Sequence, residues 1–226
     1  MSDVAANLCN IRSKIRAACS RAGRKENEVT LIAVTKTFPV ERIREAFDAG
    51  QRDVGENRLQ EAESKIPLLP SSLRWHYIGQ LQRNKVRKVL PLFSMIHSID
   101  SLRLAQYTNE VARDLGLFPQ VLLQVNHADE SSKAGFSLDD LRSQWNDLLQ
   151  LDRLEITGLM TVPPAVDDPE KARPWFATLR DLRDELSQQA KVPLPHLSMG
   201  MSSDYEIAVE EGATHVRVGS AIFGSR

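Results

Sequence analysis

The sequence lacks the features of secreted, metal-binding and membrane-spanning proteins. Only two cysteines, Cys9 and Cys19, occur among its 226 residues. Both fall in one predicted helix, where a rise of about 1.5 Å per residue separates them by about 15 Å, too far for a disulfide. No CxxC or Cys/His spacing indicates a metal site. No apolar run reaches about 18 residues and no basic-then-apolar leader opens the chain, so we expect a cytoplasmic protein without a metal.

The chain also lacks an excess of charge of either sign. Its 29 basic and 30 acidic side chains give a formal net charge of −1. Bulk electrostatics therefore favours neither a nucleic-acid nor a membrane partner. Hydrophobic residues make up 42% of the sequence and charged residues 26%, which is typical of a soluble globular protein.

Short apolar runs alternate with helical patterns along the whole sequence. One strand-like run occurs about every 28 residues, which favours an α/β fold with a single closed (β/α)₈ TIM barrel over residues 1–226. An extra helix precedes the first strand and could close the bottom of the barrel. An open doubly wound sheet is the alternative, but it would leave the last run at an edge. The predicted strands are 31–34, 53–54, 75–78, 95–99, 120–125, 156–160, 197–198 and 214–218.

The first predicted strand leads into a single lysine. Residues 31–34 are continuously apolar, as in a parallel strand covered on both faces. Lys36 would lie at the carboxyl end of this strand, where α/β barrels bind ligands. Partial loss of water there would favour a neutral amine that forms Schiff bases. An ordinary lysine whose aliphatic stem covers the strand end would give the same pattern. This strand by itself favours the ordinary lysine over one that forms a Schiff base.

Two loops predict a phosphate site at the same end of the barrel. In such barrels an anion often binds at the loops after the seventh and eighth strands, through backbone N–H groups and a helix N-terminus. Here these loops are 199–203 and 219–220. Gly200 and Gly219 permit close backbone approach, although each could serve only a turn. The two loops together with Ser202 make anion binding the better interpretation. The fifth strand runs into a polar loop over 126–136.

Other polar residues also have structural explanations. Ser203 and Glu206 have the spacing of a capping box and need no ligand. A buried arginine is costly without a partner, so Arg217 should point into the mouth of the barrel, either toward a ligand or toward a carboxylate of a neighbouring strand. Strand alternation suggests that one of His76 and His97 faces the helix layer as a core residue. We assign no proton-transfer role to either.

A lysine nucleophile, a phosphate site and an arginine are the three parts needed to hold pyridoxal 5′-phosphate (PLP) through its aldehyde, phosphate and pyridine nitrogen. Phosphosugar aldolase chemistry stays open, because it uses a lysine imine and the same phosphate loops. The position of Lys36 on the first strand favours the cofactor.

Seven motifs spread over nearly the whole chain resemble the pyridoxal phosphate homeostasis protein family. The motifs are AVTKT (33–37), GEN (55–57), HYIGQLQRNK (76–85), HSID (97–100), GLMT (158–161), LSMGMSSD (197–204) and RVG (217–219). The resemblance implies a barrel like the N-terminal domain of alanine racemases, with PLP on Lys36 and Arg217 facing the pyridine nitrogen. It also implies that Ser202, Ser203, Gly219 and Ser220 surround the phosphate and that Asn57, His76 and Ser198 line the ring.

The resemblance further implies a carrier or regulator of PLP in vitamin B6 and amino- or keto-acid balance, without a catalytic residue. Racemases need a second base from a further domain, and the sequence offers no segment for one after the eighth strand, so we expect a holder of cofactor. The alternative is a low-activity, racemase-like PLP enzyme acting on amino acids. We expect a monomer whose partners are PLP and PLP-dependent apo-enzymes.

Overall fold

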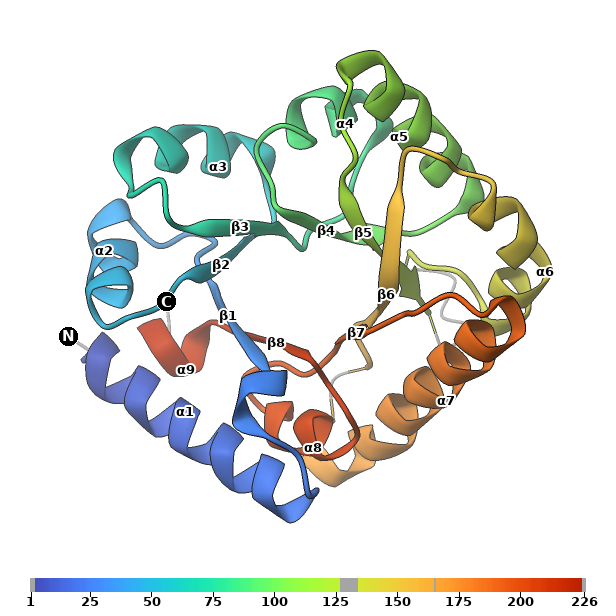
Figure 1. Cartoon of the computed structure of the whole chain (residues 1–226). Helices are drawn as coiled ribbons and strands as arrows, with labels where there is room; N and C mark the ends of the chain where they lie inside the picture. The colour runs from blue at the N-terminus through green and yellow to red at the C-terminus, as the bar shows by residue number, and fades with distance from the viewer. Residues whose placement is uncertain (1–2, 127–133, 165, 225–226) are drawn as a thin grey trace.

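The computed structural model describes residues 3–126, 134–164 and 166–224. In these segments eight parallel strands form a closed barrel in the order β1 to β8, surrounded by helices (Figure 1). The predicted (β/α)₈ barrel is confirmed. Of the predicted loop over 126–136, residues 127–133 lie outside the described segments. The strands are β1 (Thr30–Val34), β2 (Asp53–Glu56), β3 (Arg74–Tyr77), β4 (Met95–Ile99), β5 (Gln120–Val125), β6 (Glu155–Thr161), β7 (His196–Ser198) and β8 (His215–Val218).

The pairing of the last strand with the first closes the barrel. Strands β1 and β8 run parallel, in a register that extends from Thr30 opposite His215 to Ala33 opposite Val218. Neither strand is therefore an edge, and Val216 of β8 is fully buried. The alternative open sheet is excluded.

The helices alternate with the strands as predicted. Residues 58–69 form α3 and then a 3₁₀ turn, because Pro67 has no N–H to bond the carbonyl of Glu63. The short α9 was not predicted. Among the described residues, none of the helices is long and apolar enough to cross a bilayer. The α-helices are α1 (Val4–Arg21), α2 (Val40–Asp48), α3 (Leu59–Lys65), α4 (Arg83–Val89), α5 (Leu102–Leu115), α6 (Leu138–Leu149), α7 (Arg173–Ala190), α8 (Tyr205–Glu210) and α9 (Ser220–Phe223); 3₁₀ turns occur at Glu26–Glu28, Ile66–Leu68 and Pro169–Ala172.

The extra helix α1 completes the outer ring of helices instead of closing the bottom of the barrel. It lies between α2 and α8 in Figure 1 and packs against both, and also against α9. The Asn7 side-chain amide donates to the Ile222 carbonyl at 2.8 Å, and Leu8 and Ile11 are buried. Because α9 has only one turn, it cannot cover β8 and β1 alone, and the apolar face of α1 covers the rest.

The strands place apolar side chains toward the helices and a mixed set toward the interior of the barrel, which we call the lumen. Ala33 and Val216 belong to the main core under the helices. Met95, Leu122 and Met160 form a separate buried cluster. Strand alternation accounts for these two layers, because successive side chains point to opposite faces.

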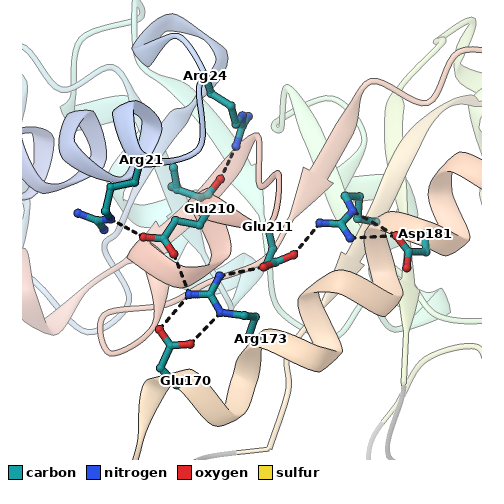
Figure 2. Close-up of polar contacts among 9 residues, drawn as sticks. Arg21, Arg24, Glu170, Arg173, Asp181, Glu210 and Glu211 are labelled. Carbon is teal, nitrogen blue, oxygen red and sulfur yellow. Dashed lines mark hydrogen bonds and ion pairs between the residues drawn. The ribbon is translucent and has the colours of Figure 1, made fainter.

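Ion pairs join three outer helices near the C-terminus of α8 (Figure 2). Arg173 of α7 bonds Glu210 at 2.7 Å and Glu211 at 2.8 Å. Arg21 of α1 contacts Glu210 at 2.6 Å, and Arg180 of α7 contacts Glu211 at 2.6 Å. Two acidic residues at a helix C-terminus are unfavourable beside the helix dipole. The arginines offset this charge and fix the order α1, α8, α7.

We expect Arg173→Met to lower the free energy of unfolding by about 1 kcal/mol at neutral pH, because it leaves two half-buried carboxylates short of a cation. Burial raises the pKa of Glu210, but hydrogen bonds from Arg173 and Arg21 outweigh burial and lower it. A carboxylate with a lowered folded pKa stabilises above its unfolded pKa and loses this effect as pH falls. The difference from the wild type should therefore shrink below about pH 4. Urea unfolding at several pH values measures it.

The matched control is Arg142→Met, which breaks a bidentate but exposed pair with Glu185. Its effect should be smaller than that of Arg173→Met, because water screens both partners. Equal losses in the two variants would contradict a special role for the Arg173 cluster.

Candidate functional site

A cavity of about 550 Å³ opens at the carboxyl ends of the strands. Its walls come from β1, β8 and the loops after β2, β3, β6, β7 and β8. His76 and Ser198, two residues predicted to line a cofactor ring, lie buried in β3 and β7 and are not among the lining residues. The other seven predicted cofactor residues do line the cavity: Lys36, Asn57, Ser202, Ser203, Arg217, Gly219 and Ser220.

Lys36 lies in a tight turn directly after β1. The N–H of Thr35 bonds the Gly55 carbonyl at 3.0 Å and continues the sheet, and Phe38 N–H bonds the Thr35 carbonyl at 3.1 Å. Thr37 has a φ of 67°, a conformation that costs energy for a β-branched residue. Its N–H donates to Glu61 Oε2 at 2.7 Å, which holds this conformation. The backbone on both sides of Lys36 is therefore anchored.

A buried ion pair supports this turn from below. Lys65 Nζ donates to Glu56 Oε1 at 2.6 Å and to the Thr35 carbonyl at 2.9 Å. The Thr35 hydroxyl donates to the same Glu56 oxygen at 2.7 Å. Burial raises the pKa of Glu56, although hydrogen bonds from Lys65 and Thr35 oppose the shift. Glu56 Oε2 has no donor among the described residues, which also disfavours the charged form.

Sequence reasoning missed the role of Lys65. It lies in α3, four residues after Glu61, so it matches an ordinary surface ion pair of a helix. Glu56 stood within the GEN motif but was given no function. The acidic residue at the end of the short strand β2 could have predicted the pair, because a carboxylate on a buried strand needs a partner.

The two loops predicted to bind an anion meet in the structure. The N–H of Gly219, after β8, donates to Ser202 Oγ, after β7, at 3.3 Å. Gly200 has a φ of 90°, and a Cβ there would lie 2.6 Å from the Cβ of Ala208. This tight turn requires glycine. It brings Ser202 and Ser203 to the same cavity wall as Ser220.

The capping box expected between Ser203 and Glu206 is not formed. The helix α8 begins at Tyr205, and its N-cap residue is Asp204, without a side-chain capping bond. Asp204 instead accepts a hydrogen bond from the N–H of Met201 at 2.6 Å and so closes the loop. The expectation was wrong by one residue, and the Ser203 side chain lines the cavity.

Arg217 of β8 is 4% exposed and touches both the lumen and the cavity. Its Nη1 donates to Ser198 Oγ at 2.6 Å and its Nη2 to the Thr161 carbonyl at 2.8 Å. Burial lowers the pKa of Arg217 to about 10, and the charge of Asp204 opposes the shift. It forms no ion pair with any described carboxylate and its Nε has no described partner. A hydrogen-bond donor therefore remains for a ligand.

Both His76 and His97 face the lumen, so the expectation that one of them faces the helix layer is wrong. His76 Nδ1 lies 3.0 Å from His97 Nε2. The alternation rule applies within one strand, and the relative phase of β3 and β4 brings both rings inward. The His215 ring lies edge-on to His97, with 5.8 Å between the ring centroids, and is tilted against His76 at 6.0 Å.

Asn57 follows β2 and carries a second ligand signal. The residue lines the cavity, and its Oδ1 is buried and has no hydrogen-bond donor among the described residues. A buried acceptor without a partner costs about 1–3 kcal/mol unless a ligand or water supplies a donor. With the amine of Lys36, the serine hydroxyls and the donor of Arg217, the residues present fit a phosphorylated aromatic aldehyde.

Fold and cavity together define a barrel of the alanine racemase N-terminal class. The profile of the family described as "Alanine racemase, N-terminal domain" matches residues 6–226. Alanine racemase of Clostridium difficile superposes with a TM-score of 0.76 over 99% of this chain and 57% of that one, at 16% identity. That similarity concerns the fold alone.

Within this class, the chain belongs to the pyridoxal phosphate homeostasis protein family. It is 44% identical to the family member of Aquifex aeolicus, with 97% of this chain and 96% of that protein covered. It is also 44% identical to the Escherichia coli member, with 100% and 98% covered. The structure of PipY from Synechococcus elongatus with PLP bound superposes with a TM-score of 0.86, at 41% identity over 98% of this chain and all of that one. The predicted family is confirmed.

The buried pair under the Lys36 turn yields a stability prediction. We expect Lys65→Met to reduce the free energy of unfolding by about 3–5 kcal/mol at neutral pH, because it leaves Glu56 buried without its cation. The loss should grow as pH rises above about 4, since a raised folded pKa means that ionisation of the carboxyl costs stability. Chemical denaturation across pH measures both effects.

Two further variants test the cause. Lys88→Met removes an exposed lysine that lies 4.0 Å from Glu63 of α3, and it should have little effect. Adding Glu56→Gln to Lys65→Met should recover part of the loss, because a neutral amide is cheaper to bury than a carboxylate. A Lys65→Met loss no larger than that of Lys88→Met would refute the pairing.

Proposed function

We propose that this chain binds PLP, holds it as a Schiff base on Lys36 and serves intracellular PLP and amino- or keto-acid homeostasis without robust catalysis of its own. The observation that carries the proposal is one cavity that joins an amine, hydroxyl groups and a buried guanidinium. Relatives named for pyridoxal phosphate homeostasis and the PLP-bound structure of PipY support it. We propose a cytoplasmic monomer that supplies apo-enzymes.

Lys36 is the covalent anchor in this proposal. Lys36 would hold the cofactor by condensing its amine with the PLP aldehyde, which forms a C=N bond and releases one water. The anchored turn limits the movement of the lysine to its own side chain, since Thr35 and Thr37 are both held. The side chain therefore starts from a fixed backbone position at the wall of the cavity.

Hydroxyls and an amide bind the rest of the ligand. Ser202, Ser203 and Ser220 offer three hydroxyl donors on one wall, suited to a phosphate. Gly219 keeps this wall open, because a Cβ there would lie 3.3 Å from the Val34 carbonyl oxygen. The orphaned Asn57 Oδ1 would gain a donor from the ligand or from water.

Arg217 would donate its free Nε to the ring nitrogen. A guanidinium cannot accept a proton, so it favours an unprotonated ring nitrogen and weakens the ring as an electron sink. His76 and Ser198 lie below the cavity and would act on the ring only through Arg217, to which Ser198 is bonded.

The cavity wall supports a holder more than an enzyme. Among the described lining residues, only Lys36 and Arg217 are ionisable, and a guanidinium has no lone pair to accept a proton, so Lys36 is the one candidate base. Racemisation needs a base on each face of a substrate carbon. The proposal therefore assigns no catalytic residue.

We expect the purified protein to show a visible absorption band of lysine-bound PLP that borohydride bleaches, with the reduced cofactor mapped to Lys36 by peptide mass spectrometry. Lys36→Ala should remove the band and the covalent adduct, while Lys85→Ala, a lysine of the HYIGQLQRNK motif, should keep both. Absence of PLP binding by the wild type would refute the proposal.

A panel of amino acids tests the alternative of a low-activity, racemase-like PLP enzyme. The holder should give no multiple turnover of any amino acid, because the described cavity wall offers a single base. Turnover that is lost in Lys36→Ala would establish an enzyme instead.

A further inference from the structure

An unbroken chain of hydrogen bonds crosses the lumen below the cavity. It starts at Arg217 Nη1, which lies 2.6 Å from Ser198 Oγ. Ser198 Oγ lies 2.8 Å from His97 Nδ1, and His97 Nε2 lies 3.0 Å from His76 Nδ1. The chain ends where His76 Nε2 meets Asp53 Oδ1 at 3.1 Å. All five side chains are buried, and they come from five different strands.

The far end of this chain is fixed at the opposite opening of the barrel. Asp53 begins β2 and lines a second cavity of about 520 Å³, together with Arg74 and Arg52. Arg74 Nε donates to Asp53 Oδ1 at 2.7 Å, and its side chain is 60% exposed. Burial raises the pKa of Asp53, but hydrogen bonds from His76 and Arg74 outweigh burial and lower it to about 2. The far end is therefore a carboxylate near neutral pH.

The chemistry of the two ends determines the direction of every hydrogen bond between them. Arg217 can only donate, and the Asp53 carboxylate can only accept. Ser198 accepts from Arg217 and gives its own proton to His97 Nδ1. His97 then carries its proton on Nε2 and donates it to His76 Nδ1. His76 in turn donates from Nε2 to Asp53, so all donors point one way.

The reverse direction is disfavoured while Asp53 is charged. It would bring an unprotonated His76 Nε2 against the carboxylate, two acceptors face to face. It would also leave the Ser198 hydroxyl proton without a described acceptor, because Ser198 would accept from both Arg217 and His97. Burial lowers the pKa of His97 well below its usual value, and nearby His76, His215, Arg217 and His196 lower it further, so this ring stays neutral.

We infer that Asp53 is a positioning residue for Arg217: through His76, His97 and Ser198 it orders one directional hydrogen-bond chain that holds the guanidinium in place from the opposite end of the barrel. The consequence for ligand binding rests on the proposed PLP function, whereas the order of the chain does not. A carboxylate far from the cavity, and the exposed Arg74 that holds it, then influence the affinity of the cavity for PLP.

The direct test is the tautomeric state of the two histidines in the ligand-free protein. Two-bond ¹H–¹⁵N spectra of the imidazole rings should show both His97 and His76 protonated on Nε2. In Asp53→Asn the new amide can donate to His76 Nε2, which permits the reverse direction, so the signals of both rings should change. The side-chain ¹⁵N signals of Arg217 should show faster rotation of the guanidinium than in the wild type.

Titration with PLP tests the consequence. Asp53→Asn should weaken the affinity about tenfold, the effect of one weakened hydrogen bond to a charged group. Arg74→Ala should also weaken the affinity for PLP, but by less than Asp53→Asn. Arg52→Ala is the matched control, because Arg52 lines the same cavity and its described side-chain contacts are the Phe47 and Gln51 carbonyls and the Phe47 ring. It should leave both affinity and ring signals unchanged.

The outcomes separate the inference from the proposed function. Histidine signals that are unchanged in both Asp53→Asn and Arg74→Ala would overturn the inferred order of hydrogen bonds. A loss of affinity for PLP without a change of tautomer would overturn it as well. If Asp53→Asn does not fold, the wild-type ring signals decide, since protonation of His97 or His76 on Nδ1 would overturn the inferred order of hydrogen bonds. If the wild-type protein binds no PLP, the proposed function fails, while the ring and guanidinium signals still decide the inference.

Discussion

The pairing of β8 with β1 is the constraint on which the site depends. In an open sheet these two strands would lie at different places along the sheet, and Lys36 after β1 would be separated from Arg217 of β8. Closure places their backbones side by side, with Ile32 opposite Arg217 in the register. Because all strands are parallel, the loops after β7 and β8 meet the turn after β1 at one rim. The pairing of β8 with β1 thus brings an amine, the proposed anion site and a guanidinium together.

Closure also creates the energetic problem that the lumen has to solve. A barrel interior is ordinarily filled by branched apolar side chains, and here Met95, Leu122 and Met160 fill only part of it. The arginine that serves the cavity brings a charge into this space, and a buried charge is costly unless its donors are bonded. Ser198 and the rings of His97 and His76 carry those bonds to the opposite opening, where Asp53 meets solvent-exposed Arg74. The lumen is therefore polar because the arginine at the floor of the cavity needs hydrogen-bond partners.

Sequence patterns predicted the elements and the cavity wall because both follow from strand ends, which local apolar runs reveal. Lys36, Ser202 and Arg217 were found this way, and their roles as cofactor residues stay predictions. Partners far apart in the chain could not be found. Lys65 reaches Thr35 and Glu56 only after α3 folds back over β1 and β2, and the pairing of His76 with His97 depends on the relative phase of two strands. The one-turn helix α9 is too short for any periodicity to show.

The distribution of rigidity argues for a tether more than for a catalyst. Every described group next to Lys36 is held: Thr35 by Glu56 and Lys65, Thr37 by Glu61. Arg217 is held by Ser198 and Thr161. An enzyme that moves protons on both faces of a carbon needs a second base placed as firmly as the first, and the described cavity wall offers serines, an amide and apolar side chains in its place. Such a frame suits recognition of a ligand more than action on it. In the proposed function, the bond to Lys36 would be the one reversible element in an otherwise fixed site, and its formation and loss would set how long the ligand stays.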